Sequence, residues 1–161
     1  MINTDSEVSV ANVKLSFTIR TPPELCESST EYLYYQVKHY KILKIKKFTF
    51  TFMRAMQFVN LTGCQSLSDI ISAIDCFKLV CQIRNVISLK IDTMTLVLRG
   101  KSACVEKFPE DVFIKKYHRR FPAITVKHRI RGLAANIFPR TIVIMGAKHV
   151  NNAEIFLKYI T

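Results

Sequence analysis

Two asparagines occupy similar places in two similar stretches of the chain. Asn12 follows Val10-Ala11 and Asn85 follows Ile83-Arg84, at an offset of 73 residues (85 − 12). A side-chain amide N–H can donate a hydrogen bond to an acceptor on a ligand. A single asparagine in a strand is more often an edge or turn residue, but the repetition favours a functional role.

Two pairs of aromatic residues repeat in the same order. Tyr35 and Phe52 are 17 residues apart, as are Phe121 and Phe138 (52 − 35 and 138 − 121). An aromatic side chain at a strand end usually belongs to a core, but an exposed one can contact a ligand. An apolar run ending in glycine follows each pair. A twofold repeat of this length predicts two similar lobes, because a solenoid needs three or more units.

The charge of the chain points to a polyanionic partner. The formal net charge is +12. Eleven basic residues lie between Arg99 and Arg140 against three acidic ones, and a second cluster of five lysines lies between Lys38 and Lys47. Two clusters in register with a repeat favour phosphate contact over a merely solvated face. We expect Arg129 and Arg140 of the larger cluster to contact phosphates.

The sequence offers no catalytic or cofactor-binding motif. The four histidines are scattered, the five cysteines form no CxxC motif, and four glycines leave little room for a phosphate-binding loop. No apolar run approaches the roughly 18 residues that span a bilayer. We therefore expect no enzyme, no cofactor, no metal and no membrane partner. Residues 1–7 are acidic and polar, and we expect a disordered N-terminus there.

The hydrophobic pattern predicts mostly strands. Residues 8–19 alternate between apolar and polar side chains, which is typical of a half-buried strand. Ser66 and Asp69 form a variant capping box for a helix reaching Leu79. We expect further strands at 36–43, 47–53, 56–62, 81–91, 94–98, 123–130, 133–138 and 141–145, a short helix within 24–35, a helix or loop over 104–119 and a final helix over 151–160. The two halves, 8–79 and 80–161, should share one continuous sheet.

These features resemble the core domain of the TATA-box-binding protein family. Phe121-Pro122, Ile137-Phe138 and Gly146-Ala147-Lys148 look like the family's Phe-Pro-Gly, Ile-Phe and Thr-Gly-Ala-Lys. Residues 10–12 and 83–85 look like its two Ile-Gln-Asn elements. The resemblance covers nearly the whole chain. It implies an α+β fold, a saddle of two pseudo-symmetric repeats that form one curved antiparallel sheet with helices on the convex face.

The resemblance also implies a function. Such a protein binds and bends duplex DNA, preferably AT-rich, through the minor groove, and initiates transcription with general transcription factors or RNA polymerase subunits. The family is itself a known example of aromatic wedges in the groove. The matching positions are Asn12, Thr62, Asn85, Ile87 and Val143 for groove readout, Tyr35, Phe52, Phe121 and Phe138 for the wedges, and Lys41 and Lys127 for phosphate contact.

Several positions depart from the family pattern. Lys14, Asn60 and Asn136 make the groove face more polar, and the basic run 115–120 stands where the family has acidic residues that hold the B-type general transcription factor. These departures suggest a viral or specialised member, in a nucleus or a cytoplasmic viral factory. They leave open a protein-interaction scaffold with weakened or lost DNA binding. RNA binding by aromatic stacking on a basic sheet is a third possibility.

Overall fold

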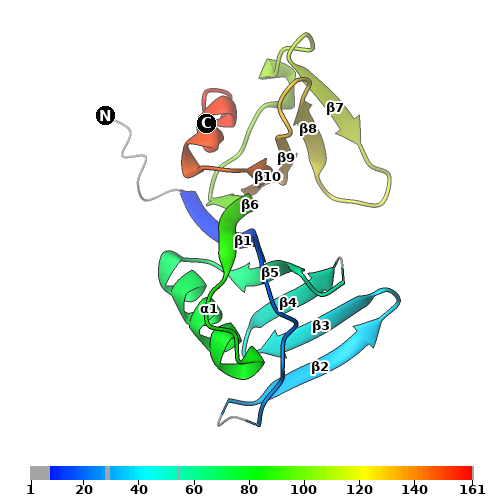
Figure 1. Cartoon of the computed structure of the whole chain (residues 1–161). Coiled ribbons are helices and arrows are strands. Elements are labelled where there is room, and N and C mark those ends of the chain that lie inside the picture. The colour runs from blue at the N-terminus through cyan, green and yellow to red at the C-terminus, as the bar shows by residue number, and fades with distance from the viewer. Residues whose placement is uncertain (1–7, 28–29, 54, 161) are drawn as a thin grey trace. The chain divides into compact units, whose positions relative to one another are not determined.

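The computed structural model describes residues 8–27, 30–53 and 55–160, which form an antiparallel sheet with few helices (Figure 1). The disorder expected for residues 1–7 lies outside the described residues. The strand order is β2-β3-β4-β5-β1-β6-β10-β9-β8-β7. The elements are β1 (Val8–Thr18), β2 (Tyr32–Val37), β3 (Tyr40–Ile45), β4 (Phe48–Met53), β5 (Phe58–Cys64), α1 (Leu67–Cys81), β6 (Ile87–Arg99), η2 (Val105–Lys107), β7 (Phe113–Tyr117), β8 (Ile124–His128), β9 (Ala134–Ile137), β10 (Thr141–Ala147), η3 (Val150–Ala153) and α2 (Glu154–Leu157).

The chain divides into two compact units. The first unit comprises residues 12–92, and the described part of the second comprises residues 8–11 and 93–160. Strands β1 and β6 contribute to both units. The boundary between the units falls inside β6, a continuous strand of 13 residues, so the compact units do not coincide with the halves 8–79 and 80–161, whose division stays a prediction.

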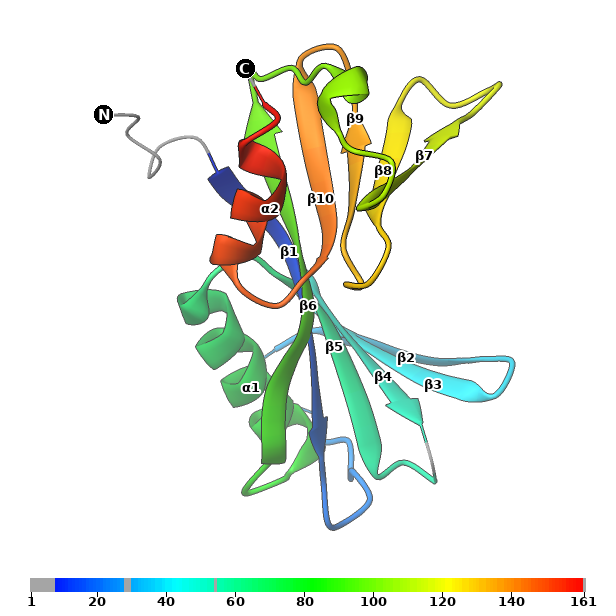
Figure 2. The same cartoon turned by 90° about the horizontal axis from the view of Figure 1, so that it is seen from above.

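In the first unit, α1 covers one face of the strands (Figure 2). The helix begins as predicted, since the Ser66 side chain accepts a hydrogen bond from the Asp69 backbone N–H. Phe77 of α1 is fully buried and lies 5.0 Å from the Phe17 ring and 4.8 Å from the Phe50 ring, measured between centroids. Aromatic packing of this kind fixes the helix on the sheet.

The second unit builds its core from the C-terminal segment. The predicted helix over 151–160 is shorter in the structure, where the 3₁₀ turn η3 leads into α2. Phe156 is fully buried and packs on Phe113 of β7, with ring centroids 5.8 Å apart. Phe108 lies 4.7 Å from the Tyr159 ring and joins the same cluster.

Several predicted elements were wrong. The strand expected at 36–43 is interrupted by the turn at Lys38 and His39 between β2 and β3. A strand, β2, occupies the end of the segment where we expected a short helix, because its aromatic and apolar residues pair with β3 along the whole strand. The expected strands at 81–91 and 94–98 are one strand, β6, since α1 extends to Cys81 and delays its start. The segment 104–119 holds η2 and then β7, an edge strand of the sheet.

Strand β5 in the first unit and strand β10 in the second have the same pattern of residues, and we call them the scaffold strands. Their residues follow the same order of buried and half-buried positions. Gly63 and Gly146 occupy the same place in this order, with φ of +100° and +81°. A Cβ atom would lie 2.3 Å from the Lys47 carbonyl oxygen at Gly63 and 2.1 Å from the Gly132 carbonyl oxygen at Gly146. Only glycine fits such positions. The close carbonyl oxygens therefore explain why a glycine recurs at this point in both halves of the sequence.

Candidate nucleic-acid interface

Each unit has an open face, which we define as the sheet face opposite its helix. Side chains alternate along a strand, so the neighbours of buried residues such as Leu61 and Ile144 point to the open face. The strand register aligns one row of paired residues across each open face. The row is Ser16, Asn60, Thr51, Ile42 and Tyr35 in the first unit, and Val97, Val143, Asn136, Thr125 and Lys116 in the second.

The second unit brings Phe121 and Phe138 together. Their ring centroids are 5.6 Å apart with an interplanar angle of 73°, an edge-to-face contact. Phe121 is 44% exposed and lies in the six-residue loop 118–123 between β7 and β8. Phe138 is half-buried just after β9, where its backbone N–H donates to the Thr141 carbonyl oxygen. This is an accessible aromatic pair, which is the kind of side chain that can insert between base steps.

The described residues of the first unit include no such pair, and the wedge prediction for Phe52 was wrong. Phe52 is 1% exposed and packs 6.0 Å from the Phe77 ring in the core. The register explains the error, since Phe52 pairs with Val59 as Ile137 pairs with Ile142 in the second unit. The counterpart of Phe138 is therefore Met53, one residue after Phe52.

Tyr35 does not join Phe52 in a pair either. It lies within β2, because the turn between β2 and β3 contains only Lys38 and His39. A two-residue turn leaves no room for a loop like 118–123, so the first unit has no counterpart of Phe121. Tyr35 is 38% exposed on the open face, with the Lys44 ammonium 5.9 Å from its ring centroid.

The two asparagines singled out in the sequence are not equivalent. The Asn12 side-chain oxygen accepts a hydrogen bond from the Gly63 N–H at 3.2 Å, which leaves its Nδ2 as the group that can donate to a ligand. Asn85 lies in the connection between α1 and β6, and with Ile87 it lines a small hollow beside Arg20 and Arg84. The expectation of a repeat at offset 73 was therefore wrong.

The register identifies the true counterpart of Asn12 as Thr93. Val13 pairs with Cys64 in the first unit, and Met94 pairs with Ala147 in the second. Cys64 and Ala147 each follow the scaffold glycine, so the residues before Val13 and Met94 correspond. The two remaining readout candidates do lie on open faces, with Thr62 paired to Thr49 and Val143 in the row described above.

The predicted phosphate contacts separate into two groups. Lys127 is exposed on the open face, where it pairs with Ala134, but Lys41 pairs with the buried Phe52 and so emerges on the helix side. The open-face counterpart of Lys127 is Lys44. Lys41 is therefore misplaced for a ligand on the open face.

The two arginines expected to contact phosphates differ in their surroundings. Arg129 donates from Nε to the Glu110 carbonyl oxygen at 2.8 Å, which ties it to the neighbouring loop. Arg140 is exposed two residues after Phe138, in the turn between β9 and β10. Its place beside the aromatic pair suits phosphate contact, which stays a prediction for both arginines.

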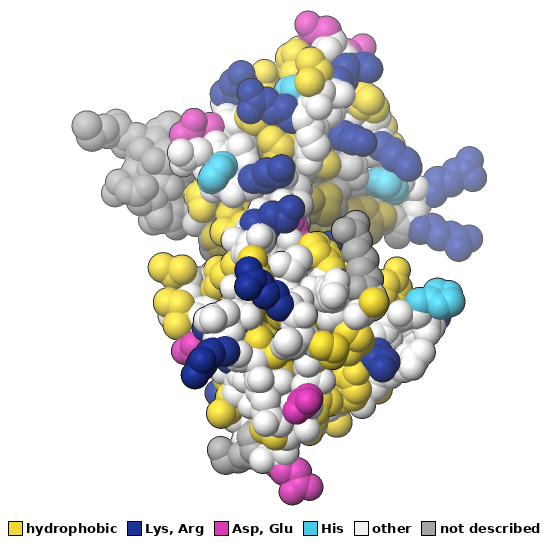
Figure 3. All heavy atoms as spheres, in the orientation of Figure 1, with side chains coloured by type: hydrophobic (Ala, Val, Ile, Leu, Met, Phe, Trp, Pro, Cys, Tyr) yellow, Lys and Arg dark blue, Asp and Glu magenta, His cyan; other side chains and the backbone are white. Residues whose placement is uncertain are grey.

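Two arginines next to the aromatic pair were missed. Arg119 and Arg120 are exposed in the same loop as Phe121. Lysine and arginine side chains gather over the β7–β8 hairpin and its loop (Figure 3). The basic run 115–120 belongs to the cluster that the sequence assigned to phosphate contact, but its two arginines were not singled out as contact residues.

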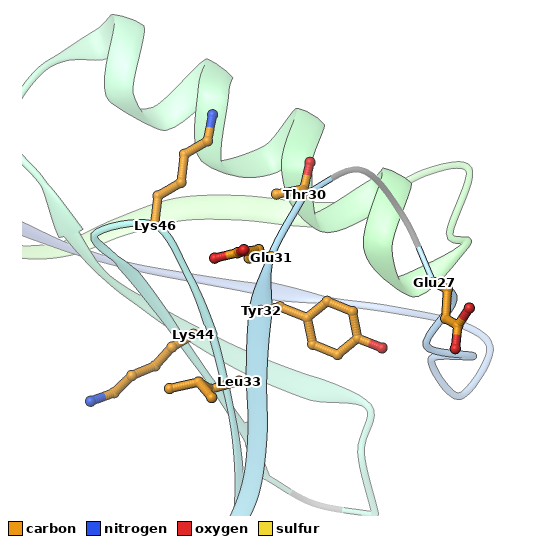
Figure 4. A pocket seen from close by; sticks show the side chains of 7 residues that line it. All are labelled: Glu27, Thr30, Glu31, Tyr32, Leu33, Lys44 and Lys46. Carbon is orange, nitrogen blue, oxygen red and sulfur yellow. The ribbon is translucent and has the colours of Figure 1, made fainter.

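Two further features of the described residues are a hollow beside β2 and a pair of buried thiols. A hollow beside the edge strand β2 is lined by Glu27, Glu31, Lys44 and Lys46 among others, and the two lysines point to different sides of it (Figure 4).

Burial raises the pKa of Cys64 to about 11 and that of Cys81 to about 12, so both thiols are protonated at neutral pH. Within the described residues no group of three or more His, Cys, Asp or Glu side chains could hold a metal ion. No described helix is long and apolar enough to cross a membrane.

Comparisons with known proteins bear on the fold. No family model and no curated protein sequence matches this chain. Among solved structures, that of Methanococcus jannaschii TBP is similar, with a TM-score of 0.71 and 21% identity over 94% of each chain. The likeness confirms the α+β fold of the TATA-box-binding protein core that the sequence predicted.

Proposed function

We propose that this chain, which has the TATA-box-binding protein fold, is a transcription initiation factor that binds and bends duplex DNA through the minor groove. The observation that carries the proposal is the accessible aromatic pair, in which the exposed Phe121 contacts the half-buried Phe138. The net charge of +12 supports it, as do Arg119 and Arg120 beside the pair. We place the wedge in the second unit alone.

The mechanism follows from the side chains at this site. The basic loop approaches the phosphates and positions the protein without reading sequence. Phe121 and Phe138 then insert at a base step, partly unstack it and kink the duplex. Val143 lies on the open face of the second unit beside the opened groove. On the open face of the first unit, Asn12 and Thr62 offer side-chain donors, and an amide donor distinguishes A·T from G·C pairs by the groove acceptors. AT-rich duplex is therefore the preferred ligand.

The proposal extends to partners and location. A factor of this kind works with general transcription factors or RNA polymerase subunits, in a nucleus or in a cytoplasmic viral factory. The basic run from Lys115 to Arg120 would repel a partner whose positively charged surface is complementary to acidic residues at this place. We therefore expect any B-type factor to dock differently on this chain.

The direct test measures DNA bending by fluorescence transfer between the ends of a short AT-rich duplex. Phe121→Ala and Phe138→Ala should each reduce the bend. The matched control is Tyr117→Ala, because Tyr117 is 66% exposed in the same unit but alternates onto the helix side of β7. An equal loss of bending in all three variants would contradict the wedge. Failure of the unaltered chain to bind duplex DNA would contradict the function itself.

A specific observation also favours a second candidate, a protein-interaction scaffold. The open side of the β2–β3 hairpin exposes apolar side chains, with Leu33 66% exposed and Val37 and Tyr40 each 44% exposed. Apolar patches of this sort are common at protein interfaces. A chain that binds polymerase subunits but neither binds nor bends duplex DNA would favour this second function.

A further inference from the structure

Three polar side chains form a hydrogen-bonded chain on the open face of the second unit. The His118 Nε2 lies 3.0 Å from the Thr125 hydroxyl. That hydroxyl donates to the Asn136 Oδ1 at 2.7 Å. Thr125 and Asn136 are direct partners in the register of β8 and β9. The three residues therefore form a connected network that fixes each side chain relative to the next.

The direction of the hydrogen bonds fixes how Asn136 is presented. The Thr125 hydroxyl has one hydrogen, and because it donates this to Asn136, His118 must donate to Thr125 through Nε2–H. The Asn136 oxygen is thereby held toward Thr125, and its Nδ2 points the other way. There it lies 3.8 Å from the Met145 sulfur, a weak acceptor that uses at most one of the two amide hydrogens. Asn136 thus offers a donor of fixed orientation.

The network is joined to the aromatic pair. The His118 ring stands perpendicular to the Phe121 ring, with centroids 5.6 Å apart and an interplanar angle of 89°. Phe121 in turn contacts Phe138, which follows Asn136 by two residues. A base pair next to a step opened by these two phenylalanines would lie within reach of the Asn136 amide.

The fold itself does not require this network. In the first unit, the register places Thr51 at the position of Asn136 and Ile42 at that of Thr125. Ile42 has no polar side-chain atom, so no such chain can form there, although the strands pair in the same way. The network is a property of the unit that carries the wedge.

We propose that Asn136 is a sequence-reading residue of the second unit, with His118 and Thr125 as its positioning residues. Asn136 donates from Nδ2 to adenine N3 or thymine O2 at the base pair beside the wedged step. A G·C pair places the guanine N2 amino group at that position, and two donors would then face each other. This inference rests on the proposed minor-groove binding and adds the residue that selects the base pair beside the wedge.

The test uses the full chain and a bent AT-rich duplex in which single pairs are changed. Each A·T pair near the kink is replaced in turn by G·C and by inosine·C, which lacks the N2 amino group. A single 3-deazaadenine then removes the N3 acceptor. At the pair that Asn136 reads, the unaltered chain should bind A·T and inosine·C alike and G·C more weakly, by roughly 5- to 150-fold.

Three variants separate reading from structure. Asn136→Leu should weaken binding to the A·T duplex and remove both the discrimination at that pair and the effect of 3-deazaadenine. Thr125→Val keeps the shape of the side chain but breaks the network, so it should reduce the discrimination. Thr51→Val, the matched change in the first unit, should leave it unaltered. The ¹⁵N shifts of His118 report the tautomer independently, and we expect a proton on Nε2.

The outcomes distinguish the two proposals. If the unaltered chain does not bind duplex DNA, the proposed function fails and this inference fails with it. If binding and bending are normal but Asn136→Leu discriminates as the unaltered chain does, only the reading role is overturned. A neutral His118 with its proton on Nδ1 would overturn the positioning role.

Discussion

The two units share the scaffold strands β5 and β10 with the same burial order, yet their outer strands present different surfaces. In the first unit the β2–β3 turn has two residues, and the aromatic side chain nearest the end of β4 is buried in the core. In the second unit a six-residue loop carries Phe121 to the half-buried Phe138. The same strand pairing thus supports an accessible aromatic pair in one unit and none in the other.

This difference shows where the two units could have diverged in function. Loops and strand ends tolerate changes in length and side chain that the glycine-bearing scaffold does not. The first unit exposes apolar and basic side chains on β2 and β3, which suits contact with a protein or with phosphates. The second adds the accessible aromatic pair of Phe121 and Phe138 and the polar network of Asn136. We therefore expect substitutions at matched positions to have unequal effects.

The largest expected contrast is between Phe52 and Phe138. Phe52→Ala opens a cavity in the first unit's core and should cost about 3–5 kcal/mol of unfolding free energy. Phe138→Ala removes a half-buried ring and should cost well under half of that, while reducing DNA bending. Urea unfolding measures the free energy lost in each of the two variants, and fluorescence transfer measures the bending. Equal losses of stability would mean that Phe138 is a core residue, and the contrast between the units would disappear.

The scaffold glycines should behave alike in the two units. At Gly63 and Gly146 an alanine would combine a positive φ with a clash against a carbonyl oxygen. Gly100, with φ of +74° and nothing within 4 Å of a Cβ, is the matched control for the φ effect alone. Gly100→Ala should cost about 1–2 kcal/mol, and Gly63→Ala and Gly146→Ala should each cost more, as measured by urea unfolding. A tolerated alanine at only one of the two would show that the scaffold is not shared.

Much of the fold could be predicted from the sequence because the signals were local. The alternation in residues 8–19 and the Ser66 cap each indicated one element correctly. The aromatics around Tyr35 were harder to assign, since strand and helix patterns overlap in short apolar runs. Pairing with β3 decides the matter, and that partner is not visible in the local pattern.

The candidate site was only half predictable for a related reason. Phe121 and Phe138 were found, but Asn85 and Phe52 were assigned by counting residues between repeats. Loop lengths differ between the units, so equal spacing in the sequence does not mean equal position in the sheet. The strand register replaces Asn85 with Thr93 and Phe52 with Met53. A one-residue shift also moves a side chain to the other face.

A smaller effect should separate the lysines of the two faces. Lys127→Ala removes an open-face charge, so the slope of log affinity against log salt should flatten by roughly 0.9 for each phosphate that is no longer neutralised. Lys44→Ala should flatten the slope by the same amount if the first unit also contacts the DNA phosphates. Lys41→Ala, on the helix side, is the control and should leave the slope unchanged. A flatter slope with Lys41→Ala would place the DNA elsewhere than on the open face.

The smallest expected effect concerns the ion pair that fastens α1 to the first unit. The Lys47 ammonium lies 2.7 Å from Asp69 Oδ2, and this hydrogen bond, with one from the Gln65 backbone N–H, holds the pKa of Asp69 below its usual value of 3.8. A depressed pKa in the folded state means that the carboxylate adds stability above the unfolded pKa, and that this is lost as the pH falls through the folded pKa. Asp69→Asn should therefore lower the melting temperature slightly at pH 7, and the difference should shrink below pH 3.8.

Lys47→Ala provides the control for this effect, because it removes the larger cause of the pKa shift. In that background the pH dependence of the Asp69→Asn difference should be weaker, with only the Gln65 N–H left to favour the charged carboxylate. The measurement is the melting temperature of four proteins between pH 2 and 7: the unaltered chain, Asp69→Asn, Lys47→Ala and the double variant. This range extends about three pH units above the usual carboxyl pKa, so the carboxylate is fully charged at its upper end. A difference between Asp69 and Asn that stays constant over this range would show that the pair holds no charge-dependent stability, and that the packing of the buried face of α1 holds the helix in place without it.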